Sequence, residues 1–200
     1  ILRRTHAYVH CIIPQFTEIT INFQRVPVVG TSNPLVARWI PTPDESLVVI
    51  RFKDKEYFID EKAAVHYVNR GLNTFAFELN FQHKGTTIPG WLFDETKLTT
   101  HYFLVSEIQS RSAHVHDLTA FRLVSVNRNK LLAFLEEKSW GKAFLTEKVN
   151  MVMEGRPRYV LSSSNPEARV VKTRRLQKKP LNLVIVLDDL LQAGVAKELI

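Results

Sequence analysis

The stretch "TPDESLVVIRFKDKEYFIDEK", residues 42–62, decides the expected fold. "SLVVIRF" is rich in β-branched residues, "KDKE" is polar enough to turn, and "YFID" returns as a second strand, so the stretch predicts a β-hairpin. Alternate side chains of a strand share a face, which places Asp60 and Lys62 about 6.6 Å apart on one face, with Glu61 on the other. The hairpin brings the start of its first strand beside the end of its second. Asp44 and Asp60 are therefore expected to meet at one end of the sheet.

Further strands are expected downstream of the hairpin. Alternating or β-branched runs stand at "NTFAFELNF" (73–81), "LTTHYFLVSEI" (98–108) and "TAFRLVSV" (119–126). Between the hairpin and the first of these runs, "AAVHYVNRG" predicts a loop or a short helix that ends at Gly71.

The last third of the chain changes its pattern. Leucines at helical spacing predict a helix from about Asn129, capped by Asn129 or Asn127. Residues 154–180 are polar, basic and rich in turn formers, which predicts an exposed excursion. Residues 181–200 combine an apolar strand with an amphipathic helix. Together these elements predict an α/β protein with a central mixed β-sheet flanked by helices, in which residues 1–126 form the core and residues 127–200 form a C-terminal extension packed on the same domain.

Composition limits the classes of function. The chain has 27 Lys and Arg against 20 Asp and Glu, a formal net charge of +7, which favours a polyanionic partner such as nucleic acid. Cys11 is the single cysteine, so neither an intramolecular disulfide nor a cysteine zinc cluster is expected. No run of 18 apolar residues occurs, so we expect a cytoplasmic protein without a membrane partner.

Two motifs at hairpin distance carry a resemblance. Pro43-Asp44, followed by the hairpin and Asp60-Glu61-Lys62, resembles the PD-(D/E)xK nuclease superfamily, which includes restriction endonucleases and many phage and mobile-element nucleases. This resemblance implies a restriction-endonuclease-like core.

The order of the following segments is similar to that of phage-type members of this superfamily. "GLNTFAFEL" (71–79), a loop with Gly90 and Trp91, and "TKLTTHYFLV" (96–105) follow one another in the same order. Leu72 and His101 depart from the family pattern, at a threonine-like and an aspartate-like position.

The resemblance implies magnesium-dependent hydrolysis of DNA phosphodiester bonds, with Mn²⁺ able to substitute for Mg²⁺. Asp44 and Asp60 would hold the metal, helped by the backbone carbonyl of Glu61. Lys62 would orient or deprotonate the attacking water and offset charge in the transition state. Glu78 would add a further carboxylate from the neighbouring strand. Asp54 is the rival to Asp44 as the first carboxylate, although a turn residue is its simplest interpretation.

Basic residues are the candidates for contacts with the phosphates of DNA. They are Arg70, Lys84, Lys172, Arg174 and Arg175. Two rival functions stay open: a basic nucleic-acid-binding module that does not cut, and an assembly or interaction protein of a phage or mobile element. The nuclease would act as a homodimer or with a subunit that directs it.

Overall fold

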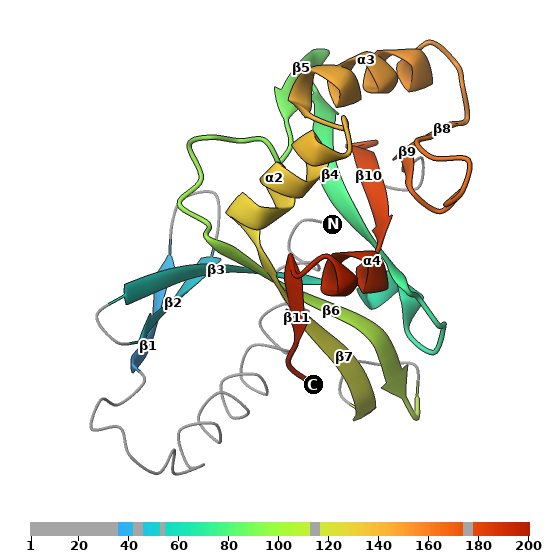
Figure 1. The fold of residues 1–200 in the computed structure, drawn as a ribbon. Coiled ribbons are helices and arrows are strands. Elements are labelled where there is room, and N and C mark those ends of the chain that lie inside the picture. Colours follow the sequence, from blue (N-terminus) through green and yellow to red (C-terminus); the bar gives the residue numbers. More distant parts are fainter. Residues whose placement is uncertain (1–35, 42–45, 53–54, 113–116, 174–177) are drawn as a thin grey trace. The chain divides into compact units, whose positions relative to one another are not determined.

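The computed structural model describes residues 36–41, 46–52, 55–112, 117–173 and 178–200 (Figure 1). The strands are β1 (Val36–Pro41), β2 (Ser46–Phe52), β3 (Lys55–Ala63), β4 (Thr74–His83), β5 (Thr86–Pro89), β6 (His101–Ser110), β7 (Leu118–Asn127), β8 (Arg158–Val160), β9 (Arg169–Lys172), β10 (Leu181–Val186) and β11 (Ala196–Glu198). The helices are η1 (Val65–Tyr67), α2 (Arg128–Glu137), α3 (Lys142–Met153) and α4 (Leu187–Gln192). The α/β class predicted from the sequence is confirmed.

The described strands form two sheets, whereas the sequence predicted one central sheet. The first has the order β1-β2-β3-β6-β7-β11, and it is mixed because β3 pairs with β6 in parallel while β2 pairs with β3 antiparallel. The second has the order β5-β4-β10-β9-β8, and all its neighbours pair antiparallel. The strand that contains Glu78 thus belongs to a different sheet from the hairpin.

The hairpin of residues 46–63 is confirmed. Leu47 lies opposite Asp60 and Val49 lies opposite Phe58. Leu47, Val49 and Ile59 are buried. Ile59 lies on the opposite face of the hairpin from Leu47 and Val49, so apolar side chains are buried on both faces, and their burial stabilises the hairpin.

The prediction that residues 154–180 form an exposed excursion is confirmed for residues 154–158 and wrong for the part of the segment that joins the five-stranded sheet. Residues 158–160 and 169–172 of this segment are the strands β8 and β9. Ala168 and Val170 are almost completely buried, and Val170 lies opposite Leu183 of β10. Helix α3 packs on β8 and β9. The segment was predicted from its basic composition, and the short apolar sequence of β9 was overlooked. β9 forms because it pairs with the edge of β10.

Helix ends and the C-terminal elements agree with their sequence patterns. The side chain of Asn127 caps α2 by accepting a hydrogen bond from the backbone N–H of Lys130. The predicted strand and helix at the C-terminus are β10 and α4, and the sequence did not predict β11 after them. No helix in the described part of the chain is long and apolar enough to cross a membrane.

The described residues divide into two compact units. One contains the described residues up to Gly71, with Thr99–Leu123 and Leu199–Ile200, and the other contains Leu72–Leu98 and Val124–Glu198. Each unit is built from segments that are distant in sequence. The division of the chain after residue 126 stays a prediction.

Asn69 closes one end of the β6 edge in the first unit. Its backbone N–H donates to the carbonyl of Ile108, and its side-chain Nδ2 donates to the carbonyl of Ser110 at 2.9 Å. The backbone N–H of Ser110 in turn donates to Asn69 Oδ1 at 2.8 Å. Asn69 has a φ of 59°, a left-handed conformation that asparagine adopts more readily than most residues. Its side chain thus forms the two bonds that a strand backbone would form.

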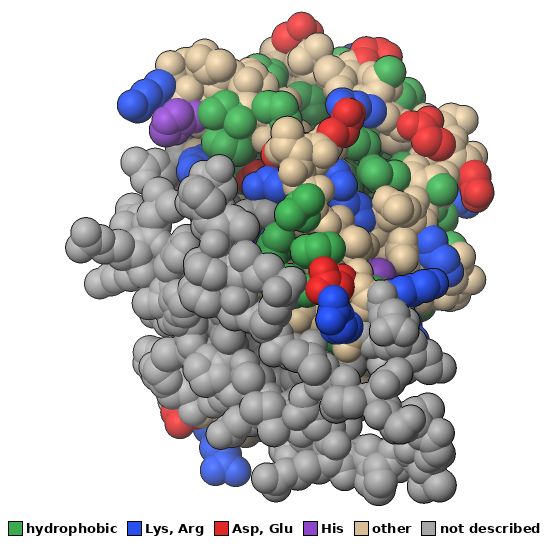
Figure 2. All heavy atoms as spheres, turned by 90° about the vertical axis from the view of Figure 1, so that its left-hand side faces the viewer, with side chains coloured by type: hydrophobic (Ala, Val, Ile, Leu, Met, Phe, Trp, Pro, Cys, Tyr) green, Lys and Arg blue, Asp and Glu red, His purple; other side chains and the backbone are tan. Residues whose placement is uncertain are grey.

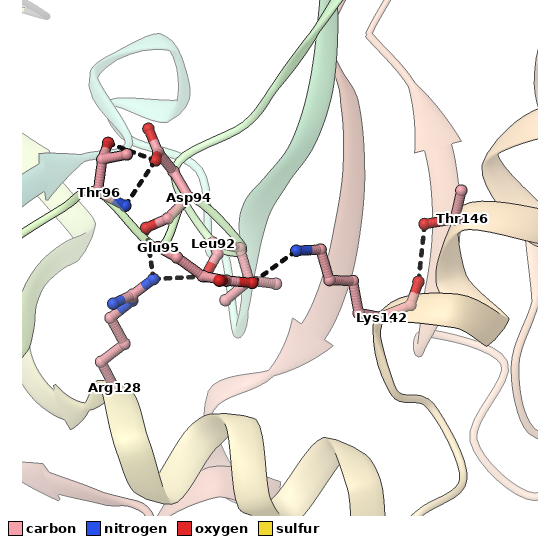
Figure 3. A network of polar contacts seen from close by, with 7 residues as sticks. All are labelled: Leu92, Asp94, Glu95, Thr96, Arg128, Lys142 and Thr146. Carbon is pink, nitrogen blue, oxygen red and sulfur yellow. Dashed lines mark hydrogen bonds and ion pairs between the residues drawn. The ribbon is translucent and has the colours of Figure 1, made fainter.

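A loop between β5 and β6 is fixed by two helices of the second unit (Figure 3). The guanidinium of Arg128, at the start of α2, donates to the carbonyls of Asp94 at 2.7 Å and of Leu92 at 3.4 Å. Lys142, at the start of α3, pairs with Glu95 at 2.8 Å. Hydrogen bonds from Thr96 lower the pKa of the Asp94 carboxyl. Arg128 is buried, whereas the Lys142–Glu95 pair is exposed, so Arg128 is expected to dominate the stability of the loop.

Replacing Arg128 by Met is expected to lower the free energy of unfolding by about 2 kcal/mol, because two largely buried carbonyls lose a charged donor. Replacing Lys142 by Met removes an exposed ion pair and is expected to change it by less than about 0.5 kcal/mol. Urea denaturation of both variants measures the difference. Equal effects would show that the burial of Arg128 adds nothing.

Candidate functional site

Asp60 and Lys62 of β3 form a partly buried ion pair. Lys62 Nζ lies 2.7 Å from Asp60 Oδ1, and the Asp60 side chain is 5% exposed while that of Lys62 is 28% exposed. β3 lies between β2 and β6, where Leu47 and Tyr102 are the neighbours of Asp60 in register. Both neighbours are buried, so the carboxylate lies between buried side chains while the ammonium reaches solvent.

Burial makes the Asp60 carboxylate dependent on Lys62. Asp60 Oδ2 is inaccessible and has no hydrogen-bond partner among the described residues. A buried carboxylate loses much of its hydration, and a nearby cation offsets part of this loss. The charge that the sequence places at the end of β3 is thus explained by an internal ion pair.

Glu61 lies on the opposite face of β3. Burial, and secondly the charge of Asp60, raises the pKa of the Glu61 carboxyl to about 7. In register, Ile59 lies beside His101 and Glu61 lies beside Phe103, so Glu61 and His101 belong to the same face of two neighbouring strands. Two titratable groups are therefore placed on one face of the sheet.

His101 is also held by its neighbours. Its ring stands edge-on to Tyr57, with centroids 5.5 Å apart, and its Nδ1 lies 3.1 Å from Thr100 Oγ1. Burial lowers the pKa of His101. The sequence identified His101 only as a departure from the family pattern. The alternation of β3 and β6 could be predicted from the sequence, but the parallel register that sets His101 beside Ile59 could not.

The predicted carboxylates are not brought together by the described part of the chain. Asp44 and its rival Asp54 lie outside the described residues. Glu78 lies in β4, whose neighbours are β5 and β10, so its predicted place on a strand next to β3 is wrong. Of the predicted catalytic residues, the structure brings together Asp60 and Lys62.

Metal binding was tested against the donors that the structure describes. Across these residues no group of three His, Cys, Asp or Glu side chains could hold a metal ion. Asp60 offers one carboxylate, and its Oδ1 is already paired with Lys62. Mg²⁺ needs near-octahedral oxygen ligands, which these residues alone do not provide.

The predicted phosphate-contacting residues lie in different places. Arg70 is exposed after η1, Lys84 is exposed in the turn between β4 and β5, and Lys172 is half-buried at the end of β9. Arg174 and Arg175 lie outside the described residues. Their roles in binding stay predictions.

Comparison with known proteins gives matches to kinases over a short segment. Over 54 residues, 27% of this chain, the sequence is 80% identical to Phosphoribulokinase 2 of Cereibacter sphaeroides and 74% identical to Phosphoribulokinase of Xanthobacter flavus. The same length is 68% identical to Phosphoribulokinase of Nitrobacter vulgaris. The chain spans less than a fifth of the length of these relatives, 18% of the first and 19% of the other two. No family model and no solved structure matches the chain.

These relatives correct the function predicted from the sequence. They are named as kinases, which are transferases, so the PD-(D/E)xK assignment, the magnesium-dependent deoxyribonuclease activity and the DNA partner are wrong. Neither rival function, the nucleic-acid-binding module or the phage assembly protein, matches these names. A short charged motif carried the resemblance, and its charge has a structural explanation in the ion pair.

The buried Glu61 carboxyl predicts a pH dependence of stability. Its pKa is raised from 4.5 to about 7, so the folded chain holds a proton there that the unfolded chain releases. The resulting stabilisation is complete below pH 4.5 and is lost as the pH rises to about 7. Replacing Glu61 by Gln is expected to remove this loss, which amounts to at most about 3 kcal/mol.

Urea denaturation of the wild type and of the Glu61→Gln variant across this pH range measures the effect. The variant gains stability over the wild type toward pH 7 if Glu61 titrates as described. Parallel stability curves would contradict the assignment. Glu56→Gln, on the same strand, is the matched control.

Proposed function

We propose that this chain acts as part of a phosphotransferase of the phosphoribulokinase class and contributes to binding the sugar phosphate. The supporting observation is the 80% identity to Phosphoribulokinase 2 over 54 residues. Because the chain spans less than a fifth of that relative, the complete reaction needs residues beyond those that the match covers.

Phosphoryl transfer depends on positioning and on electrostatic stabilisation more than on covalent chemistry by the protein. A chain with a net charge of +7 suits ligands that carry phosphate. The 200 residues contain no G-x-x-x-x-G-K-[ST] sequence, the loop that cradles nucleotide phosphates in many kinases. The sequence thus offers no such loop for the nucleotide, and we assign the acceptor to the hairpin of β2 and β3.

Lys62 is the residue we assign to the acceptor's phosphate. Its ammonium is held in place by Asp60 and reaches solvent at the end of the hairpin. A positioned ammonium forms charge-assisted hydrogen bonds with phosphate oxygens. Mg²⁺ would accompany the phosphates of the donor, as is usual in phosphoryl transfer, because no group of three His, Cys, Asp or Glu side chains among the described residues could hold the ion by itself.

Calorimetric titration of the chain with a ribulose phosphate tests the proposal. Wild type is expected to bind, and Lys62→Arg, which keeps the charge, is expected to retain most of the affinity. Replacing Lys62 alone by Met would leave the Asp60 carboxylate uncompensated, so the double variant Asp60→Asn, Lys62→Met is used. Its dissociation constant is expected to rise about tenfold, because one charged contact is lost.

Lys55→Met is the matched control, since Lys55 is an exposed lysine at the other end of β3. It is expected to leave binding unchanged. With ATP and Mg²⁺ present, the isolated chain is expected to bind the sugar phosphate without turnover. Absence of binding by the wild-type chain would overturn the proposal, and turnover would show that the chain is a complete kinase.

A further inference from the structure

Four lysines stand at one end of the five-stranded sheet. In register, Leu181 of β10 lies between Asn80 of β4 and Lys172 of β9. The end of β4, the end of β9 and the start of β10 therefore meet at the same end of the sheet. Lys84, Lys172, Lys178 and Lys179 lie there, and we call them the lysine patch.

Backbone and ring contacts hold these segments together. The backbone N–H of Gln82 donates to the carbonyl of Lys178 at 3.2 Å, and that of Thr173 donates to the carbonyl of Pro180 at 2.8 Å. The ammonium of Lys178 lies 4.7 Å from the centre of the Phe81 ring. A cation over an aromatic face is attracted to it, so Lys178 is restrained while it stays exposed.

The segments that carry the lysine patch contain no acidic residue. Residues 81–89 and 168–187 carry no Asp or Glu. On the described part of the face drawn in Figure 2, several Lys and Arg side chains lie near Asp and Glu side chains. Like charges on neighbouring segments repel, and no acid in these segments offsets the repulsion. A bound anion would remove this cost.

Two of the four lysines hold an unfavourable backbone conformation. Lys84 has a φ of 49° and Lys179 a φ of 43°. Lys84 and Gly85, with a φ of 81°, form the two-residue turn between β4 and β5, where Asn-Gly is the preferred pair. The left-handed conformation costs a side-chain-bearing residue about 1 kcal/mol relative to glycine. Such positions cluster at ligand sites, where the side chain itself is needed.

The chemistry of the lysine patch favours a small phosphate ligand over a protein. Lysine is depleted in protein interfaces, whereas it is a common phosphate ligand. The large exposed hydrophobic side chains of the described residues are Tyr67, Leu98, Met153, Val160 and Ile200, and none lies in these segments. Three adjacent strands span roughly 10 Å, a distance that suits a few linked or neighbouring phosphate groups.

We propose that the lysine patch binds a ligand that carries two or more phosphate groups. The ligand class rests on the proposed function, because adding phosphate to a sugar phosphate yields a bisphosphate and consumes a nucleoside triphosphate. Either could occupy the lysine patch, since both present several phosphate groups to the same cations.

Titration of the 200-residue chain with tripolyphosphate tests the lysine patch without any turnover. The double variant Lys84→Gly, Lys179→Gly keeps the left-handed turns, because glycine adopts them freely. It is expected to weaken binding at least about tenfold while keeping or raising the midpoint of thermal unfolding. The double variant Lys55→Gln, Lys197→Gln removes two exposed lysines elsewhere and is expected to leave binding unchanged.

The inference is supported if only the lysine patch variant loses affinity and if added salt weakens the binding of tripolyphosphate by the wild type. Equal loss in both double variants, or no binding of tripolyphosphate by the wild type, would overturn it. Parallel titrations with ATP and with a sugar bisphosphate identify the ligand, because the ligand of the lysine patch is expected to bind more tightly than the other compound. Binding of ribulose phosphate without binding of tripolyphosphate would reject the lysine patch and leave the proposed function standing.

Discussion

The parallel pairing of β3 with β6 is the constraint on which the rest of the structure depends. Two parallel neighbours cannot be joined by a tight turn, so the chain must leave the sheet after Ala63 and return at His101. The connection carries η1, β4, β5 and the loop held by Arg128. Strands β4 and β5 pair in the second sheet, with β10 on their other side. One parallel contact thus explains why each compact unit is assembled from separated segments.

Local patterns predicted local structure well. The hairpin, β4, β6, β7 and the Asn127 cap follow from alternation, turn residues and capping chemistry within a few residues. The pairing of strands that are distant in sequence could not be predicted, because alternation indicates which face of a strand is buried but not which strand lies beside it. Glu78 shows the consequence, since its strand joined the other sheet. Residues 169–172 show it too, since the open edge of β10 outweighed their basic composition.

The Asp60–Lys62 pair explains why the sequence-based function failed. A buried carboxylate needs a cation, and the residue two positions along a strand is the nearest one on the same face. This requirement generates an aspartate and a lysine with one residue between them whether or not a metal is present. The similarity to phosphoribulokinases over 54 residues could not be derived from such spacing, because it is carried by residue identity along the segment.

Asn69 affects how the edge of β6 can pair with other strands. Beyond the last residue of β3, the outer edge of β6 would present open backbone groups to any passing strand. The Asn69 side chain occupies those groups with two short hydrogen bonds, at the carbonyl and the N–H of Ser110. Because the Asn69 amide is the end of a side chain, it does not continue as a strand that could pair with further residues of β6. The side chain of Asn69, held in a left-handed turn, therefore leaves neither polar group of the Ser110 backbone open to pairing with another strand.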